Sequence, residues 1–162
     1  MPKSRKRKSS KTGLQTIKSS RKKVSVSGKE IVHPLIIFDG VCNYCCGMVN
    51  FIIRRDPCGL FRFAPFQSEA AKRTLGKFNY PADSLDSFVL IEGGKLYTKS
   101  EAGLRVQKLL GGFHKLLYAF IVVPAPLRDA VYDYIARNRY KWYGKKEECM
   151  IPSPEIKGRF LE

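Results

Sequence analysis

The stretch that decides the fold is "LIIFDGVCNYCCGMVNFIIRRD", residues 35–56. Its first four residues are all apolar, which is typical of a strand buried on both faces. From Cys45 onward, apolar side chains recur at the spacing of one helix face, at Cys45, Met48, Val49 and Ile52. We expect this helix to end near Arg54 and Arg55, before the breaker Asp56-Pro57. Three of the five cysteines therefore lie where a buried strand leads into an amphipathic helix.

The next segments predict a second strand, a second helix and a hairpin. "LFRFAPF" (60–66) alternates, with Phe61, Phe63 and Pro65 on one side, and "QSEAAKRTLG" (67–76) contains strong helix formers before a closing glycine. In "SFVLIEGGKLYTKS", the β-rich pieces 87–91 and 95–98 are separated by Glu92-Gly93-Gly94. A Gly-Gly turn between two such pieces indicates a β-hairpin.

Two further helices are expected after the hairpin. Ser100 is the predicted cap of the first, which ends at Gly111-Gly112. The second is expected to start near Pro126 and end before Gly144, with one apolar face made of Leu127, Val131, Tyr134 and Ile135. A parallel βαβ unit, an antiparallel hairpin and closing helices follow the order of a thioredoxin-like α/β sandwich. The predicted fold class is thus α/β, with a mixed sheet and extra C-terminal helices.

Charge is concentrated at the N-terminus. The chain has 162 residues and a formal net charge of +16, and residues 1–30 hold eleven of the 30 basic side chains but one of the 14 acidic ones. Because this segment lacks aromatic residues and enough apolar content to offset its ordering entropy, we expect a disordered basic tail at 1–30. Residues 31–162, with a charge of +6, are long enough for one domain with a core.

No secretory signal is expected, since the first residues lack an apolar stretch. The longest apolar run elsewhere, "LLYAFIVVPAPL" (116–127), is short for a membrane span and contains two prolines. An odd number of cysteines without an export signal favours reduced thiols over a disulfide framework. We therefore expect a cytoplasmic protein, or an organellar or nuclear one if the basic tail is an address.

Cys42 and Cys45 form a C-x-x-C pair at the expected start of the first helix. One helical turn separates them, so the two sulfurs can close a small disulfide. A thiol at a helix N-terminus faces unpaired N–H groups and the positive end of the dipole, which favours its thiolate. We assign Cys42 as a partly exposed attacking thiol and Cys45 as the resolving thiol.

The segment "FDGVCNYCCGMVNFIIRRD" resembles the signature of the DCC family of thiol-disulfide oxidoreductases, whose Asp-x-x-Cys-x-x-Cys pattern is matched by Asp39, Cys42 and Cys45. The resemblance extends through "FAPFQSEAA" and "IEGGKLY" to "PLRDAVYDYIARNRYKWYGKKEECMIPSPEIKGRF", and so covers roughly residues 35–161. It implies a thioredoxin-like fold and dithiol exchange, without indicating a substrate.

Asp39 has two compatible interpretations. As a catalytic residue it takes the proton of Cys45 or tunes the dithiol. As a structural residue it caps the loop that follows the Asp-Gly turn.

The other cysteines have weaker assignments. Cys46 points further round the helix, and we interpret it as a buried inert thiol rather than a third redox partner. Cys58 lies in an expected exposed turn, and Cys149 either packs or acts as a second resolving thiol. Zinc needs a second spaced pair of ligands, which these isolated cysteines and histidines do not offer, so neither metal nor cofactor is expected.

The sequence thus predicts an enzyme that exchanges a Cys42–Cys45 dithiol or disulfide with a protein or small-molecule disulfide. Its partners are a disulfide- or dithiol-containing substrate and a recycling reductant; we expect a monomer with no specific nucleic acid. Two alternatives stay open. One is a redox-inert domain that docks a partner or membrane surface through the apolar run, and the other is nucleic-acid binding through the basic tail.

Overall fold

The computed structural model describes residues 33–81, 88–145 and 154–162. All of them belong to one unit, Val32–Glu162. The predicted basic tail at 1–30 and the cysteine at position 149 lie outside the described residues.

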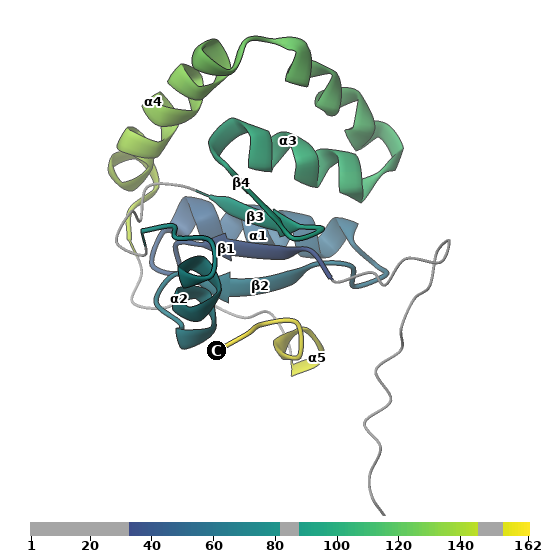
Figure 1. Cartoon of the computed structure of the whole chain (residues 1–162), viewed down its shortest axis with the longest axis vertical. Helices are drawn as coiled ribbons and strands as arrows, with labels where there is room; N and C mark the ends of the chain where they lie inside the picture. The colour runs from purple at the N-terminus through teal and green to yellow at the C-terminus, as the bar shows by residue number, and fades with distance from the viewer. Residues whose placement is uncertain (1–32, 82–87, 146–153) are drawn as a thin grey trace, which may run out of the picture. The chain divides into compact units, whose positions relative to one another are not determined.

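A mixed four-stranded sheet forms the centre of this unit (Figure 1). Its strands are β1 (Leu35–Phe38), β2 (Arg62–Pro65), β3 (Val89–Glu92) and β4 (Lys95–Thr98), in the order β2-β1-β3-β4. β1 pairs in parallel with β2 and antiparallel with β3, which pairs antiparallel with β4. The β3–β4 turn places Gly93 and Gly94 at positive φ, the conformation of a tight hairpin turn. The predicted α/β fold class, with its βαβ unit and hairpin, is confirmed.

Both faces of the sheet are covered, as the apolar run of β1 predicted. On one face, α1 (Asn43–Arg55) and α3 (Lys99–Leu110) pack against Ile36, Phe38 and Leu90. On the other face, α2 (Glu69–Gly76) packs against Leu35, Ile37 and Val89. β1 lies between β2 and β3 and is buried on both faces. The loop that follows β1 is therefore held in place at the end of a central strand.

The start of α3 differs from the prediction. Thr98, rather than Ser100, is the residue before the helix, and it makes no side-chain cap. Ser100 lies inside α3 and donates its hydroxyl to Asp129, in the next α-helix. The glycines at 111 and 112 do end the helix, both with positive φ.

The helix predicted to start near Pro126 is present, and most of its apolar face is exposed. α4 (Ala125–Tyr143) has the expected length and ends before Gly144 at positive φ, but Leu127, Val131 and Tyr134 are exposed. The residue of α4 that is buried is Arg139. Together with the 3₁₀ helix η1 (Gly112–Val122), α4 forms an arch that starts beyond α3 and returns toward the first turn of α1 (Figure 1). The arch is therefore held along its length as well as at its end: η1 contacts α3, and Asp129, Tyr132 and Asp133 of α4 make polar contacts with α3 and the residue before β3.

The C-terminal residues close the edge of the sheet beside β2. A short helix, α5 (Pro154–Lys157), is followed by Phe160, whose ring lies 5.4 Å from that of Phe63. Arg159 forms an ion pair with the buried carboxylate of Asp56. This pair connects the C-terminus to the end of α1.

Candidate active site

Cys42 is the residue that caps α1. Its backbone is extended, and its Sγ accepts a hydrogen bond from the backbone N–H of Cys45 at 3.4 Å. This places the two sulfurs on the first turn of the helix, as the spacing predicted, and both are free thiols. Negative charge on Cys42 would face the N-terminus of α1, where the helix dipole favours an anion.

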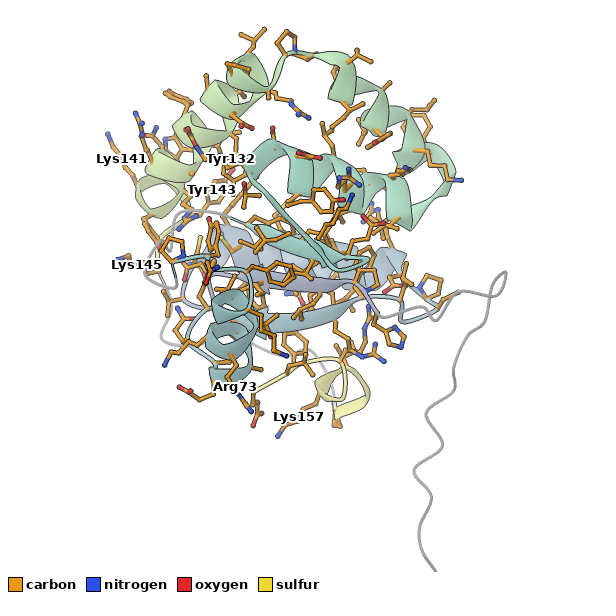
Figure 2. All side chains as sticks on the ribbon, in the orientation of Figure 1. Arg73, Tyr132, Lys141, Tyr143, Lys145 and Lys157 are labelled. Atoms are coloured by element: carbon orange, nitrogen blue, oxygen red, sulfur yellow. The ribbon has the colours of Figure 1, made fainter. Side chains whose placement is uncertain are left out.

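The expectation that Cys42 is partly exposed is wrong, because its exposed fraction is 0%. The end of α4 lies over it: Lys145 forms an isolated backbone bridge with Cys42, and Asn43 Nδ2 donates to Tyr143 O at 2.8 Å. The rings of Tyr44 and Tyr143 also pack, with centroids 5.1 Å apart. In Figure 2, Tyr143 and Lys145 lie at the end of α4 nearest to the sheet.

Cys45 is more accessible than Cys42 and lines a cavity of about 150 Å³ between α1, α3 and α4. The pKa of its thiol is strongly raised, chiefly by burial and further by its hydrogen bond to Cys42. The Asp39 carboxylate raises this pKa as well, whereas the Arg139 guanidinium lowers it. In the reduced pair, the proton therefore stays on Cys45 near neutral pH.

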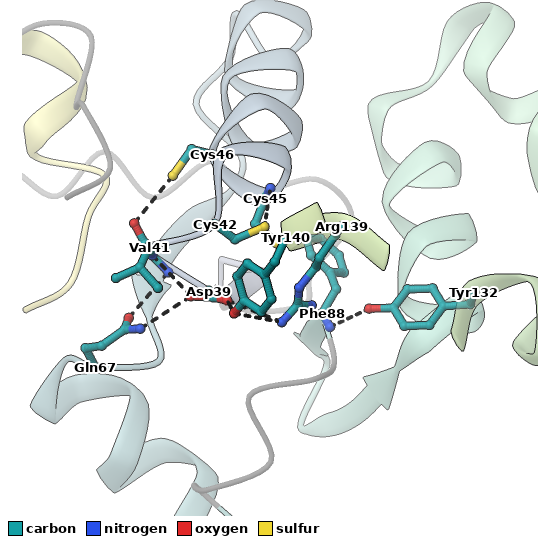
Figure 3. Close-up of polar contacts among 11 residues, drawn as sticks. Asp39, Val41, Cys42, Cys45, Cys46, Gln67, Phe88, Tyr132, Arg139 and Tyr140 are labelled. Atoms are coloured by element: carbon teal, nitrogen blue, oxygen red, sulfur yellow. Dashed lines mark hydrogen bonds and ion pairs between the residues drawn. The ribbon is translucent and has the colours of Figure 1, made fainter. Parts of the chain in front are cut away.

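Asp39 is a buried acceptor that receives hydrogen bonds from both sides of the site (Figure 3). Its Oδ1 accepts the backbone N–H of Val41 at 3.1 Å and the amide of Gln67 at 3.4 Å, so the predicted loop-capping role is confirmed. Its Oδ2 accepts Arg139 Nη2 at 3.2 Å and the hydroxyl of Tyr140. The carboxylate thus joins the active-site loop to the end of α4.

The glycine after Asp39 is required by close packing. A Cβ at Gly40 would come within 3.1 Å of both Gln67 Oε1 and Pro65 Cβ. The Gly40 N–H also donates to Gln67 Oε1 at 3.3 Å. A larger residue therefore fits only if Gln67 and Pro65 shift, and a shift of Gln67 moves the amide that binds Asp39.

Sequence reasoning missed Arg139 and Tyr140, which lie about a hundred positions from Asp39 in the chain. The pKa of Tyr140 is raised to about 12, chiefly by burial and then by its hydrogen bond to the carboxylate. The available signal was Asp39 itself, because a carboxylate that ends a fully apolar strand needs a cation or several donors when it is buried. Nothing in the sequence pattern identified which cation supplies them.

Tyr132 is a further missed residue of the site. Its hydroxyl accepts the backbone N–H of Phe88 at 2.7 Å, which ties α4 to the start of β3 (Figure 3). Burial raises its pKa to about 12, so the hydroxyl is neutral under ordinary conditions. The ring forms part of the wall of the cavity beside Cys45.

The remaining cysteines differ in state. Cys46 is buried, as expected, but it is disulfide-bonded, so its interpretation as an inert thiol is wrong. Its sulfur lies 3.5 Å from Gly40 O. Cys58 is exposed and free, as predicted for its turn. The two predictions for Cys149 lie outside the described residues.

In the part of the chain that the structure describes, no group of three or more His, Cys, Asp or Glu side chains is placed to hold a metal ion. None of the helices described has the length and apolar content that crossing a membrane requires.

Comparisons with known proteins agree with the resemblance seen in the sequence. A family model described as DCC1-like thiol-disulfide oxidoreductase matches residues 36–145. The "Uncharacterized protein YuxK" of Bacillus subtilis (strain 168) is 52% identical over 136 residues, covering 84% of this chain and 99% of that protein. A chloroplastic DCC family protein of Arabidopsis thaliana is 36% identical over 131 residues, covering 80% of this chain and 76% of that protein. No solved structure matches.

Proposed function

The chain belongs to the DCC1-like thiol-disulfide oxidoreductase family, and from this premise we propose that Cys42 and Cys45 are its redox couple. Family membership supports a general thiol-disulfide oxidoreductase role. The observation that carries the finer proposal is the position of Cys42 at the start of α1, bonded to the N–H of Cys45, with both thiols free. In the reduced pair, Cys45 keeps its proton, because burial and its contact with Cys42 raise the pKa of its thiol. The substrate is a disulfide or dithiol, and a second thiol reagent recycles the pair.

Asp39 is proposed as a positioning residue of this couple. It anchors the loop before Cys42 through the Val41 N–H and holds Arg139 near Cys45. The Asp39 charge raises the pKa of the Cys45 thiol and the Arg139 charge lowers it. The Asp39–Arg139 ion pair therefore adjusts how strongly Cys45 holds its proton. Removal of the proton from Cys45 by Asp39 itself is less well supported, because four donors already occupy the carboxylate.

A redox titration of the full-length protein tests the couple. In dithiothreitol buffers of increasing potential, the N-ethylmaleimide labels on Cys42 and Cys45, located by tandem mass spectrometry, should disappear together in one two-electron step. The step should be absent in Cys42→Ser and in Cys45→Ser. Cys58→Ser is the matched control, since Cys58 is an exposed thiol away from the site, and it should keep the step. A two-electron loss of the Cys45 label that persists in Cys42→Ser would refute the proposed couple.

The exposed arch favours a second function, compatible with the first. η1 has no buried residue, and Phe113, Leu116, Phe120 and Val122 are mostly exposed. The arch, residues 112–143, contains five basic side chains, Lys115, Arg128, Arg137, Arg139 and Lys141, and two acidic ones, Asp129 and Asp133. Apolar residues with basic neighbours fit an anionic bilayer surface, so we propose that the arch docks there. The alternative of nucleic-acid binding depends on the basic tail, which lies outside the described residues.

Vesicle sedimentation tests the docking. The protein should sediment with vesicles containing phosphatidylserine and stay in solution with pure phosphatidylcholine. Phe113→Ser combined with Val122→Ser should abolish sedimentation, because these are the two most exposed apolar side chains of η1. Leu161→Ser, at a partly exposed position near the C-terminus, is the control that should sediment normally. Sedimentation that survives the double substitution, or concentration-dependent dimers that need the same residues, would contradict bilayer docking.

A further inference from the structure

Cys45 and Cys42 differ in which surface they can reach. Cys45 lines the cavity of about 150 Å³, whereas Cys42 is fully buried and does not line it. Lys145 and Tyr143 hold the end of α4 over the loop of Cys42 through the backbone bridge and the Asn43 hydrogen bond. A molecule that enters the cavity therefore meets the sulfur of Cys45 first.

The cavity is small and its walls are largely apolar. Apolar and aromatic side chains line it: Phe38, Tyr44, Met48, Phe88, Tyr132 and Ile135. The charged groups at its margin are already paired, Arg139 with Asp39 and Lys99 with Asp133. Apolar cavities of this size in other proteins take up benzene-sized molecules. The walls therefore suit an uncharged aromatic or short aliphatic group, and no extended peptide fits.

The chemistry of the Cys42–Cys45 pair also favours an attack on Cys45 from the cavity. Because burial and the contact with Cys42 raise the pKa of Cys45, its reduced sulfur is a poor nucleophile near neutral pH. In the oxidised pair, however, Cys45 is an electrophilic sulfur that faces the cavity. Cys42 then departs at the N-terminus of α1, where the dipole favours an anion and the Cys45 N–H donates to it.

We propose that Cys45, not Cys42, is the sulfur that bonds to the substrate, and that the substrate is a small apolar or aromatic thiol held in this cavity. The inference rests on the proposed Cys42–Cys45 couple and adds its substrate class and the order of the sulfurs. It reverses the order expected from the sequence, which placed the substrate on Cys42.

The proposed steps balance as follows. A substrate thiolate attacks Cys45 Sγ of the Cys42–Cys45 disulfide, a new sulfur–sulfur bond forms, and Cys42 leaves with the electron pair as a thiolate. A second substrate thiolate attacks the substrate sulfur of this mixed disulfide, and Cys45 leaves and takes a proton from solvent. Two thiols are oxidised to one disulfide, and the enzyme disulfide is reduced to the dithiol.

Trapping the mixed disulfide tests the order of the sulfurs. Oxidised full-length protein is mixed with benzenethiol, quenched in acid within milliseconds, denatured and alkylated with N-ethylmaleimide. Tandem mass spectrometry should find the phenylthio group on Cys45 and the alkyl group on Cys42. The opposite labelling would overturn the assignment.

A cavity-filling variant tests the substrate class. A Cβ at Gly103, in the cavity wall, meets no atom within 4 Å, so Gly103→Leu extends into open space. Gly47→Leu is the matched control, because Gly47 is also helical and unobstructed but exposed and outside the cavity.

The wild-type protein should prefer an aromatic thiol. After correction for intrinsic thiol reactivity, the oxidised wild type should react with benzenethiol about tenfold or more faster than with glutathione, because the benzene ring is buried in the cavity.

Gly103→Leu should lose this preference, and Gly47→Leu should keep it, with urea midpoints confirming that both variants fold. Gly103→Ala is a milder second variant expected to lose part of it. A preference that survives in a folded Gly103→Leu would refute the cavity as the binding site. If glutathione and benzenethiol react equally through Cys42, the redox couple stands and this inference falls. If neither thiol reacts and Cys42 and Cys45 show no joint two-electron step, the proposed couple itself falls.

Discussion

Replacing Arg139 with leucine is expected to lower the free energy of unfolding by about 3–5 kcal/mol. The Arg139 and Asp39 side chains are 4% and 2% exposed, with Nη2 and Oδ2 3.2 Å apart. Removing the guanidinium leaves a carboxylate buried without its cation, and such a charge has no solvent to stabilise it. The change is measured as a shift in the urea midpoint at constant slope.

Two further variants separate the ion pair from the helix that carries it. Arg137→Leu removes an exposed arginine from the same helix and should leave the midpoint nearly unchanged. Adding Asp39→Asn to Arg139→Leu should restore part of the loss, because the buried negative charge is then gone. If Arg139→Leu were no more destabilised than Arg137→Leu, the carboxylate would not depend on Arg139.

The sequence predicted the sheet well because β1 and the hairpin are specified by local patterns. The apolar run at 35–38 has no polar position, and Gly93-Gly94 supplies the positive φ values that a tight turn needs. The cysteine pair was located in the same way, since its chemistry depends on one helical turn and the strand before it.

The prediction failed where contacts are distant in sequence. The apolar spacing on α4 placed four side chains on one face, but it did not reveal that most of this face is exposed and that Arg139 and Tyr132 hold the helix. Likewise Cys42 forms a backbone bridge with Lys145, about a hundred residues away, and no local pattern reveals this contact. An amphipathic pattern indicates that a face avoids water, but it does not identify what covers that face.

Asp56 illustrates a residue whose position was predicted and whose role was not. The sequence indicated that Asp56-Pro57 ends α1, and Asp56 is indeed the residue after the helix. Its side chain, however, is buried and accepts the backbone N–H groups of Leu60 at 2.9 Å and Phe61 at 3.0 Å. It also binds Arg159 from the C-terminus. The same carboxylate therefore organises the entry to β2 and holds the last residues against it.

Asp56→Ala is accordingly expected to cost about 3 kcal/mol or more of unfolding free energy, because it leaves buried backbone donors and a largely buried guanidinium without their acceptor. Asp56→Asn, which keeps one acceptor oxygen, should lose less. Glu69→Ala, which removes a carboxylate from an exposed pair with Lys72, is the control and should barely move the urea midpoint. Amide hydrogen exchange should become faster at residues 60–63 and at Phe160, because the neighbouring Arg159 loses its ion pair with Asp56. Equal midpoints for Asp56→Ala and Glu69→Ala would mean that Asp56 does not hold the C-terminus in place.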